Sequence, residues 1–462
     1  MISSYAVHIY LARLLGPEKY GVFGICLSII TICYVFLGSG VRQVVSKSVA
    51  KQKESAKYLL KRGLGVQLAM SITLGILVIL SAKTMAQISN DMSLELPLYI
   101  SAVIIITQSI FFVYMGILNG LKEFAAENFL LSTYSIVKAF VAIVFVYLGF
   151  AVIGGLSGFL VASFVSFIFG VILTRNLPGD KEHSVKISDM LRGTLPIIVI
   201  FSAKTIMMNV DLMAVKFLMA GGQFAGYYTS AAAISKLTYW YFVAFGVVLL
   251  PFVSSTYHNN NTEMTQNYVN KAIRYSLLTI LPIVFIISFY ANEFIFLIYG
   301  DTYNPAGIVL RILIWGLLGI GLLYLFANIM VGIGQEKIMI RYAVAGILLA
   351  VFLNCLLVPR IGVIGAALST TLSSTLLTFI VFRYIARKLR IATHLASIFR
   401  VAVALLILSL GAVATRNIDI SCLIKSCILY FFYGAALFFL KEITNRDISV
   451  VKNLVLSTSG IE

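Results

Sequence analysis

Apolar runs of about 20 residues recur along this sequence from one end to the other, separated by short polar breaks. Each run is long enough to cross the hydrocarbon core of a bilayer, which is about 30 Å thick. Inside that core every backbone polar group needs a partner within the chain, so such runs fold as helices. A β-barrel would show short alternating segments instead. The pattern therefore predicts an all-α polytopic membrane protein.

Composition agrees with this prediction. Only 11% of the 462 residues are charged, whereas soluble domains carry about 25% charged residues. The first apolar run contains His8 and Arg13 and lacks a small-residue cleavage site, so no cleavable signal peptide is expected. About fourteen transmembrane helices are predicted, near 1–15, 21–41, 64–83, 97–119, 128–149, 151–174, 193–219, 225–253, 272–292, 305–333, 338–358, 362–386, 397–415 and 423–440.

The basic residues indicate which side of the membrane each loop occupies. If the N-terminus is cytoplasmic, 24 of the 35 Lys and Arg residues fall in inner segments and only five in outer segments. Because cytoplasmic loops carry the excess of Lys and Arg, we expect a multi-pass protein of the bacterial cytoplasmic (inner) membrane with both termini cytoplasmic. Basic loops near anionic headgroups also explain the net charge of +17, so nucleic acid is not expected as a partner.

Two stretches of the sequence recur with similar spacing. "LLGPEKYGVF" (14–23) aligns with "MAGGQFAGYY" (219–228), and "VIGG" (152–155) aligns with "VIGA" (363–366). Six spans separate the copies, so both halves enter the membrane in the same sense, an arrangement found in transporters. We expect two six-helix lobes related by a pseudo-two-fold along the membrane normal, plus two C-terminal helices. The expected parts are an N-terminal lobe (1–175), a cytoplasmic linker (176–192), a C-terminal lobe (193–390) and an additional two-helix segment with a cytoplasmic tail (391–462).

Once the Lys and Arg residues at span ends are counted with the adjoining inner and outer segments, six basic residues remain inside the predicted spans, against one acidic residue. Lys138, Lys204 and Lys236 lie near the midplane, where a charge costs roughly 3 kcal/mol or more unless it faces a cavity or a partner. Arg13 and Lys216 lie within a turn or two of a span end, and we interpret them as snorkelling to the interface. The full set is Arg13, Lys138, Lys204, Lys216, Lys236 and Arg311, with Asp211 as the acid.

The sequence shows no pattern typical of a metal site or of catalysis. The five cysteines form no CxxC pair, and the four histidines form no cluster with cysteines or carboxylates. No nucleophile–base constellation appears, and the longest outer segment has about a dozen residues. We therefore expect no metal, no enzymatic activity and no cofactor, and leave open a coupling ion, H⁺ or Na⁺.

Three further stretches carry a family resemblance: "ARLLGPEKYGVF" (12–23), "IYGDTYNPAGIVLRIL" (298–313) and "LNCLLVPRIGVIGAALSTTLS" (353–373). In these stretches the sequence resembles the polysaccharide-export branch of the multidrug/oligosaccharidyl-lipid/polysaccharide exporter superfamily, the O-antigen and repeat-unit flippases. The resemblance implies two lobes around a cavity and export of an undecaprenyl-pyrophosphate-type lipid-linked oligosaccharide by alternating access. Membrane lipids are expected around the protein, and other polysaccharide assembly proteins are left open as partners.

A pyrophosphate diester is anionic, and lysine ammonium groups bind phosphate as point charges. The candidate substrate-binding residues are Lys138, Lys204, Lys236, Arg311, Tyr239 and Trp240, with the two aromatic rings stacking on sugars. Asp211 is the candidate coupling residue. Lys204 and Asp211 are seven residues apart, so we expect them on one helix face with Met208 between them. The structural alternatives are an aromatic belt, lysines that only support the fold, and an Asp211 that only neutralises Lys204.

Three other functions stay open at this point. A flippase for the lipid-linked peptidoglycan precursor would differ only in the sugar that it moves. A cation-coupled drug antiporter of the same superfamily would need acids in its cavity, and this chain offers only Asp211. A membrane polysaccharide polymerase or ligase would need a sizeable outer loop.

Overall fold

The computed structural model describes residues 2–179, 199–200, 202–219, 221–390, 395–418 and 420–442. This part of the chain is helical and contains no strand. Its α-helices are α1 (Ile2–Ser39), α2 (Val41–Lys51), α3 (Ala56–Ile88), α4 (Glu95–Leu121), α5 (Phe124–Phe145), α6 (Ala151–Leu173), α8 (Val210–Leu218), α9 (Gly222–His258), α10 (Thr262–Phe289), α11 (Ala291–Tyr299), α12 (Ala306–Gly332), α13 (Glu336–Leu389), α14 (Leu395–Ala414) and α15 (Cys422–Phe439). Short turns of helix join some of them: η1 (Lys53–Ser55), η2 (Met92–Leu94), η3 (Val146–Phe150) and η4 (Asp301–Tyr303).

The first helix, α1, is a hairpin of two antiparallel helices. The Nδ1 atom of His8 lies 3.2 Å from the hydroxyl of Tyr20, whereas twelve residues of straight helix would separate them by about 18 Å. The chain reverses at Gly16, whose φ of 70° falls in the left-handed region that glycine tolerates. The predicted break between the first two spans is therefore a tight reversal.

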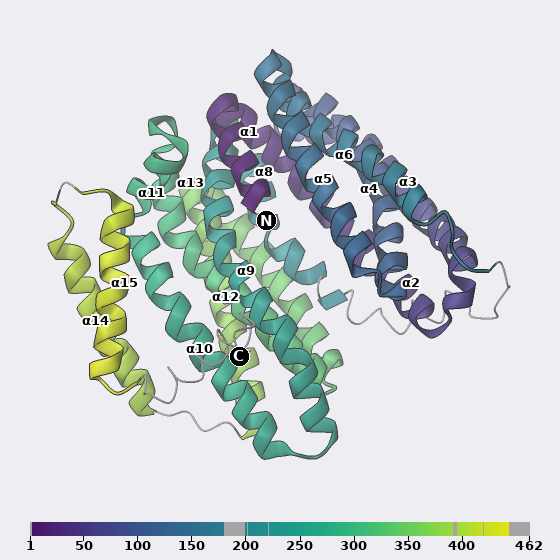
Figure 1. Ribbon diagram of the computed structural model, residues 1–462. Coiled ribbons are helices and arrows are strands. Elements are labelled where there is room, and N and C mark those ends of the chain that lie inside the picture. The colour runs from purple at the N-terminus through teal and green to yellow at the C-terminus, as the bar shows by residue number, and fades with distance from the viewer. Residues whose placement is uncertain are drawn as a thin grey trace.

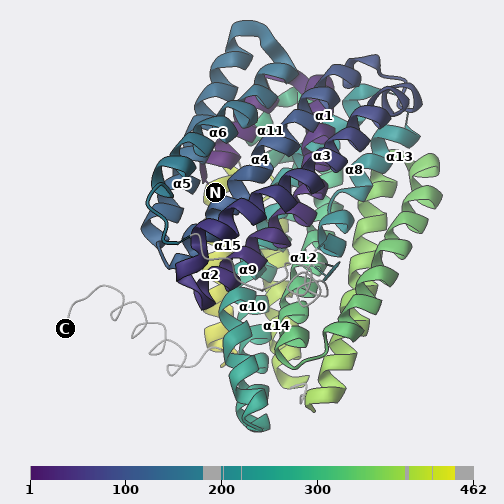
Figure 2. The same ribbon diagram turned by 90° about the vertical axis from the view of Figure 1, so that its right-hand side faces the viewer.

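Two other long segments reverse in the same way. A Cβ added to Gly346 would lie 2.5 Å from the side chain of Leu377, although both belong to α13, and Figure 2 shows the two arms of α13 side by side along one edge of the molecule. A Cβ added to Gly158 of α6 would lie 2.6 Å from the carbonyl oxygen of Lys138 of α5. Within the described residues, nine segments are long and apolar enough to span a membrane, and three of them are hairpins, which gives twelve spans. The shorter Phe399–Ala414 helix is another, and the predicted span 193–219 is described only in part, so the prediction of about fourteen helices is confirmed.

The helices form two bundles and a flanking pair (Figure 1). Helices α1 to α6, drawn in purple and blue, pack against one another, and α8 to α13, drawn in teal and green, form the second bundle. The α14–α15 pair packs on the outside of α10. The bundles meet where the second half of α1 packs along α9, and in Figure 1 they diverge toward the end where α2 and α10 lie. The predicted two-lobe architecture with two added C-terminal helices is confirmed.

The contact between α1 and α9 reveals the symmetry of the fold. A Cβ added to Gly21 would lie 2.8 Å from the amide nitrogen of Gly226, and one added to Gly24 would lie 2.3 Å from Oγ1 of Thr229. Both pairs are 205 residues apart, which is the offset of the repeat between 14–23 and 219–228. Only residues beside a two-fold axis can touch their own counterparts. The pseudo-two-fold axis therefore runs between these two helices, whose small residues permit close approach.

The segments between predicted spans contain more helix than we expected. The segment 42–63, predicted as a polar loop, contains α2, η1 and the first turns of α3. A short helix, α11, precedes Gly300, which has a φ of 90°, and α12 follows Pro305. The predicted linker, 176–192, lies mostly outside the described residues, as do the tail residues 443–462.

The sidedness can be tested by labelling single cysteines. In a background without the five native cysteines, a cysteine at Glu54 is expected to react with an impermeant maleimide only from the cytoplasmic side. A cysteine at Thr302 is expected to react only from outside. Both side chains are exposed in the structure, so access to the reagent is not limited by burial. Labelling of both positions from one side would contradict the fourteen-span topology.

Candidate functional site: a cationic cavity between the bundles

A cavity of about 750 Å³ lies between the two bundles, where they diverge. Helices α1, α2 and α4 line one side, and α9 and the segment before α8 line the other. Its charged lining residues are all basic, and no carboxylate lines it within the described part of the chain. The residues that form its wall are Thr31, Tyr34, Val35, Gly38, Arg42, Gln43, Ser46, Lys47, Phe112, Asn119, Lys204, Thr205, Met208, Asn209, Lys236, Tyr239 and Trp240.

Helix α2 brings two cations to this cavity that the sequence analysis assigned to a cytoplasmic loop. One face of α2 is buried and consists mainly of valines, Val41, Val44, Val45 and Val49. The other face carries Arg42, Gln43, Ser46 and Lys47, all of which line the cavity. The spacing of the valines at three and four residues is typical of an amphipathic helix. That spacing was the available signal for Arg42 and Lys47.

A chain of hydrogen bonds holds Arg42 in place. Its Nη2 atom donates to Oε1 of Glu127 over 2.8 Å. The other carboxylate oxygen of Glu127 accepts a hydrogen bond of 2.8 Å from the side-chain amide of Asn119, whose oxygen accepts one of 2.8 Å from Ser46. The guanidinium is thus fixed at the cavity wall and retains further N–H groups for a ligand.

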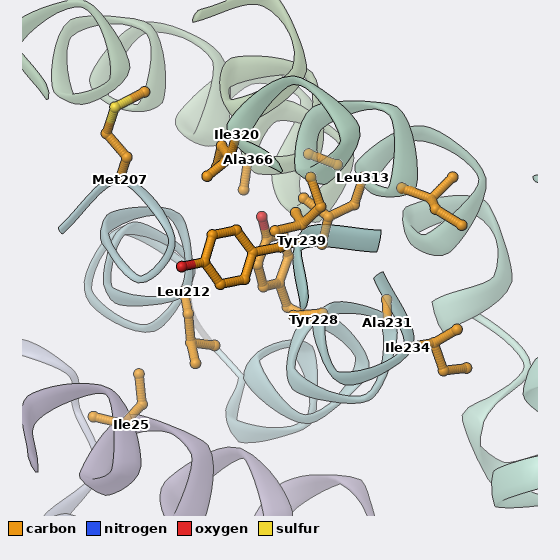
Figure 3. Close-up of a cluster of buried hydrophobic side chains, with 14 of the residues drawn as sticks. Ile25, Met207, Leu212, Tyr228, Ala231, Ile234, Tyr239, Leu313, Ile320 and Ala366 are labelled. Atoms are coloured by element: carbon orange, nitrogen blue, oxygen red, sulfur yellow. The ribbon is translucent and has the colours of Figure 1, made fainter. Parts of the chain in front are cut away.

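Lys204 reaches the cavity from the opposite bundle. Its ammonium donates to the hydroxyl of Tyr239 over 2.8 Å and lies 4.8 Å from the centre of that ring and 5.8 Å from that of Tyr324. Tyr239 is 3% exposed and belongs to the buried cluster drawn in Figure 3, whereas Trp240 is 42% exposed. The rings of Tyr239 and Tyr324 therefore stabilise the Lys204 ammonium and fix its position in the cavity wall.

The charges of Lys236 and Lys138 both act on His8. Lys236 lines the cavity, and both ammonium groups interact electrostatically with His8 of α1. Lys138 lies within the N-terminal bundle, with its Nζ 5.5 Å from the ring centre of Tyr134 and 5.2 Å from that of Phe159. Lys138 is not part of the cavity wall. The structure thus brings Lys204, Lys236 and the two predicted aromatic residues into one cavity and places Lys138 behind its wall.

Asp211 is buried in the C-terminal bundle and does not face Lys204. Its carboxylate accepts hydrogen bonds from the hydroxyl of Tyr228, from the hydroxyl of Thr370 over 2.9 Å and from the amide of Leu212 over 2.8 Å. The nearest charge acting on it is that of Lys236. Our expectation of one shared helix face was wrong, because the helix breaks in a turn at Met208 and Asn209.

Arg311 lies in a different cavity. That cavity is next to the α14–α15 pair and shares no described lining residue with the cavity between the bundles. Arg311 is exposed on α12, fewer than two turns after the helix begins. The structure therefore separates Arg311 from the other predicted substrate-binding residues.

The bundles are joined at the end opposite the cavity mouth. There the ammonium of Lys216, a residue 4% exposed, donates to Asp91 of the other bundle. Arg13 donates to the carbonyl oxygens of Leu297 and Ile298 at 2.8 Å each, at the end of α11. We call these contacts the interlobe seal. The interpretation of Lys216 as a snorkelling residue was wrong, because its charge is paired across the two bundles.

Asp91 stays ionised in the seal. Partial burial acts to raise the pKa of its carboxyl, but hydrogen bonds from Lys216 and Ser93 outweigh burial and hold the pKa below its ordinary value of 3.8. A lowered pKa means that the stabilisation by this pair is present above the ordinary value and is lost only as the pH falls through the lowered value. At neutral pH the pair is therefore a permanent charge pair.

The family assignment comes from the sequence as a whole. Residues 10–307 match the family described as polysaccharide biosynthesis protein. The chain belongs to this family. The match extends over more than half of the chain. It includes the residues of the interlobe seal and the cationic wall formed by α2, α9 and the segment before α8.

Curated relatives agree in size. The chain is 25% identical over 393 residues to an uncharacterized membrane protein of Methanocaldococcus jannaschii, covering 80% of this chain and 91% of the relative. It is 24% identical over 160 residues to a probable low-salt glycan biosynthesis flippase of Haloferax volcanii, covering 35% of this chain and 34% of that protein. The second match is local and concerns about a third of each chain.

Solved structures show the same fold. The lipid II flippase MurJ in an inward closed conformation is similar with a TM-score of 0.74 and 16% identity, over 96% of this chain and 98% of that one. An inward-facing multidrug resistance MATE family transporter of the MOP superfamily is similar with a TM-score of 0.70 and 18% identity, over 84% of this chain and 95% of that one. At these identities the likeness establishes the fold alone.

Proposed function

We propose that this protein is a flippase that moves a lipid-pyrophosphate-linked oligosaccharide across the cytoplasmic membrane by alternating access. The observation that carries the proposal is the cavity between the bundles, whose charged lining residues, Arg42, Lys47, Lys204 and Lys236, are all cationic among the described residues. A site for an anionic head group needs such a wall. The membership in a polysaccharide biosynthesis family and the similarity to a probable glycan biosynthesis flippase support it.

The cavity suits such a head group in its volume and in the sequence of cationic residues from its mouth inward. A volume of about 750 Å³ falls within the range of roughly 300–1,000 Å³ that is typical of small-molecule sites. Arg42 and Lys47 on α2 receive the pyrophosphate first, and Lys204 and Lys236 bind it deeper. The exposed face of Trp240 then stacks on a sugar ring, whereas Tyr239, which we expected to stack as well, is buried and supports Lys204 instead. The hydrocarbon tail of the carrier stays in the bilayer.

The two-bundle arrangement explains how access alternates. In the structure the interlobe seal closes one end, which the sequence assigns to the outside, and the cavity opens toward the other end. Rocking of the bundles about the α1–α9 contact breaks the seal and exposes the cavity to the outside, as in other transporters built from repeats. The substrate thus enters from the cytoplasm and leaves on the outer side.

Asp211 is the proposed coupling residue. It is a buried carboxylate, 2% exposed, with three hydrogen-bond donors and an electrostatic link to the cavity residue Lys236. Such a group exchanges H⁺ or binds Na⁺ in a way that depends on the charge in the cavity. Ion coupling through Asp211 gives the transport its direction.

Replacing Asp211 by asparagine is expected to weaken export and to flatten its dependence on pH, because the amide cannot exchange a proton. Export is measured at several pH values as the ratio of surface glycan to lipid-linked precursor. Asp301→Asn, which changes an exposed acid away from both cavities, is the control. A pH profile of Asp211→Asn identical to that of the unmodified protein would contradict a role in proton coupling.

The cavity wall argues against the drug antiporter but does not separate the two flippase functions. A cation-coupled drug antiporter needs carboxylates at its cavity wall, and the described wall has none. A flippase for a peptidoglycan precursor would use the same cationic wall, and the similarity to the lipid II flippase concerns the fold alone. The two flippase functions therefore differ only in the sugars of the substrate.

Deletion of the gene distinguishes these functions. Loss of a flippase is expected to leave a lipid-linked oligosaccharide on the cytoplasmic face, where it resists an impermeant glycosidase and is identified by mass spectrometry of the lipid extract. A repeat-unit glycan supports the proposal, and a peptidoglycan precursor supports the alternative. Normal levels and sidedness of every lipid-linked glycan would overturn both.

A further inference from the structure

A second cavity, of about 460 Å³, lies between α10, the start of α11, α12 and the turn after α14. It is separate from the cavity of the proposed function and has no role in it. Arg311 enters it from α12, and Arg416 enters it from the turn that follows α14. The remaining lining residues are Phe285, Ser288, Phe289, Tyr290, Asn292, Glu293 and Trp315.

The charges of this cavity are unbalanced. Glu293 is the carboxylate among its described lining residues, and it pairs with Lys425 of α15 over 3.6 Å. Neither the Arg311 nor the Arg416 side chain makes a hydrogen bond or an ion pair with another described residue. Two guanidinium groups therefore face one cavity with their N–H donors available, which is the chemistry that binds phosphate.

The wall of the cavity is held by hydrogen bonds and aromatic packing. The indole of Trp315 donates to the hydroxyl of Ser288 over 3.1 Å, and that hydroxyl donates to the carbonyl oxygen of Arg311 over 2.8 Å. The rings of Phe285 and Phe289 stack with their centres 6.3 Å apart. The two hydrogen bonds fix α10 against α12. The stacked rings give the cavity an apolar wall beside its two cations.

Arg311 lies at about the depth in the membrane at which lipid phosphates are found. Helix α12 has 27 residues and is about 40 Å long, which spans the hydrocarbon core and part of both headgroup layers. Arg311 follows the start of the helix, Ala306, by five residues, or about 8 Å. Val413, one turn before Arg416 and nearer the midplane, is an apolar residue that is 61% exposed. The cations thus lie at the boundary between hydrocarbon and headgroups.

We propose that this cavity binds the phosphate head group of an anionic membrane phospholipid through Arg311 and Arg416. The acyl chains lie against the aromatic wall and the neighbouring apolar helix surfaces. The α14–α15 pair contacts the rest of the described chain chiefly through α10 and through the Lys425–Glu293 pair, and the lipid adds a connection from α14 to α12. The inference goes beyond the proposed function and does not depend on which glycan is transported.

The tryptophan content makes the site directly observable. The chain has two tryptophans, so Trp240→Phe leaves Trp315 of the cavity wall as the sole tryptophan, whose fluorescence is followed. The purified full-length variant is titrated in detergent with phosphatidylglycerol or phosphatidylcholine that carries brominated acyl chains. We expect saturable quenching of Trp315, with half-saturation at a concentration at least tenfold lower for phosphatidylglycerol. Equal quenching curves for the two lipids would overturn the proposal without any arginine variant.

Arginine variants then locate the binding. Adding Arg311→Gln and Arg416→Gln is expected to abolish the tenfold preference for phosphatidylglycerol, whereas Arg360→Gln, which removes an exposed arginine outside the cavity, is expected to keep it. Persistence of the preference in the double variant would overturn the assignment. Competition with a polyprenyl phosphate tests the source of the phosphate: displacement at a concentration tenfold below that of the phospholipid would show that the carrier lipid, not a membrane phospholipid, is the occupant.

Discussion

Replacing Lys204 by glutamine is expected to lower export of the lipid-linked glycan at least tenfold while the amount of inserted protein stays the same. The Lys204 ammonium is held in the cavity wall by Tyr239. A hydrogen bond to a charged group contributes roughly 1.5–3 kcal/mol, and each 1.4 kcal/mol corresponds to about tenfold in affinity. Export is measured in cells without the native gene, as the ratio of surface glycan to lipid-linked precursor.

The control for this experiment is Lys19→Gln, which removes an exposed charge that does not line the cavity. Lys204→Arg is expected to retain part of the activity, because it keeps the charge but changes its shape. Lys236→Gln is expected to resemble Lys204→Gln. Full export by both Lys204→Gln and Lys236→Gln would show that these lysines are structural and that the cationic-cavity proposal is wrong.

Replacing Asp91 by asparagine is expected to open the interlobe seal. This change leaves the ammonium of Lys216, whose side chain is 3% exposed, without its carboxylate, and removal of one partner of a buried pair costs roughly 3–5 kcal/mol. A cysteine at Val22, a buried residue of α1, is then expected to react at least tenfold faster with an impermeant maleimide added from outside. A cysteine at Ser46, in the cavity wall, is expected to react more slowly from inside.

Asp301→Asn is the matched control, since Asp301 is an exposed acid without a contact to Lys216. Exchanging the two charges, by Asp91→Lys with Lys216→Asp, is expected to restore the labelling of the unmodified protein. Because the pKa of Asp91 is held below 3.8, mild acidification alone is expected not to open the seal. Unchanged labelling of both cysteines in Asp91→Asn would show that the pair does not hold the bundles together.

The spans and their breaks could be predicted because both depend on local sequence. A helix in lipid needs only a long apolar run, and the reversals occur where Gly16, Gly149 and Gly362 supply a positive φ. The repeat was visible in the same way, since two short stretches retained their glycines. What hydropathy could not indicate was α2, because an eleven-residue amphipathic helix has the composition of a polar loop.

The site was less accessible to sequence reasoning. The pairing of Lys216 with Asp91 joins residues that are 125 positions apart, and no local pattern encodes it. The break at Met208 and Asn209 has neither glycine nor proline to mark it, so Lys204 and Asp211 were assigned to one face. The depth of Lys204 and Lys236 in the membrane could be predicted from their position in apolar runs, and both residues line the cavity.

The contact of Gly21 with Gly226 also bears on how such a chain arises. In a homodimer of two identical half-chains, a residue on the two-fold axis faces its own copy. A substitution by a larger residue therefore adds two larger side chains at the same contact. Once the halves are joined in one gene, the two positions change independently. Gly24 and Thr229 are such a pair: a Cβ on Gly24 would lie 2.3 Å from the Thr229 hydroxyl, so two threonines would collide there. Duplication followed by divergence thus permits a larger side chain at a position in one half and a glycine at the matching position in the other. The two helices can then pack closely although their surfaces differ.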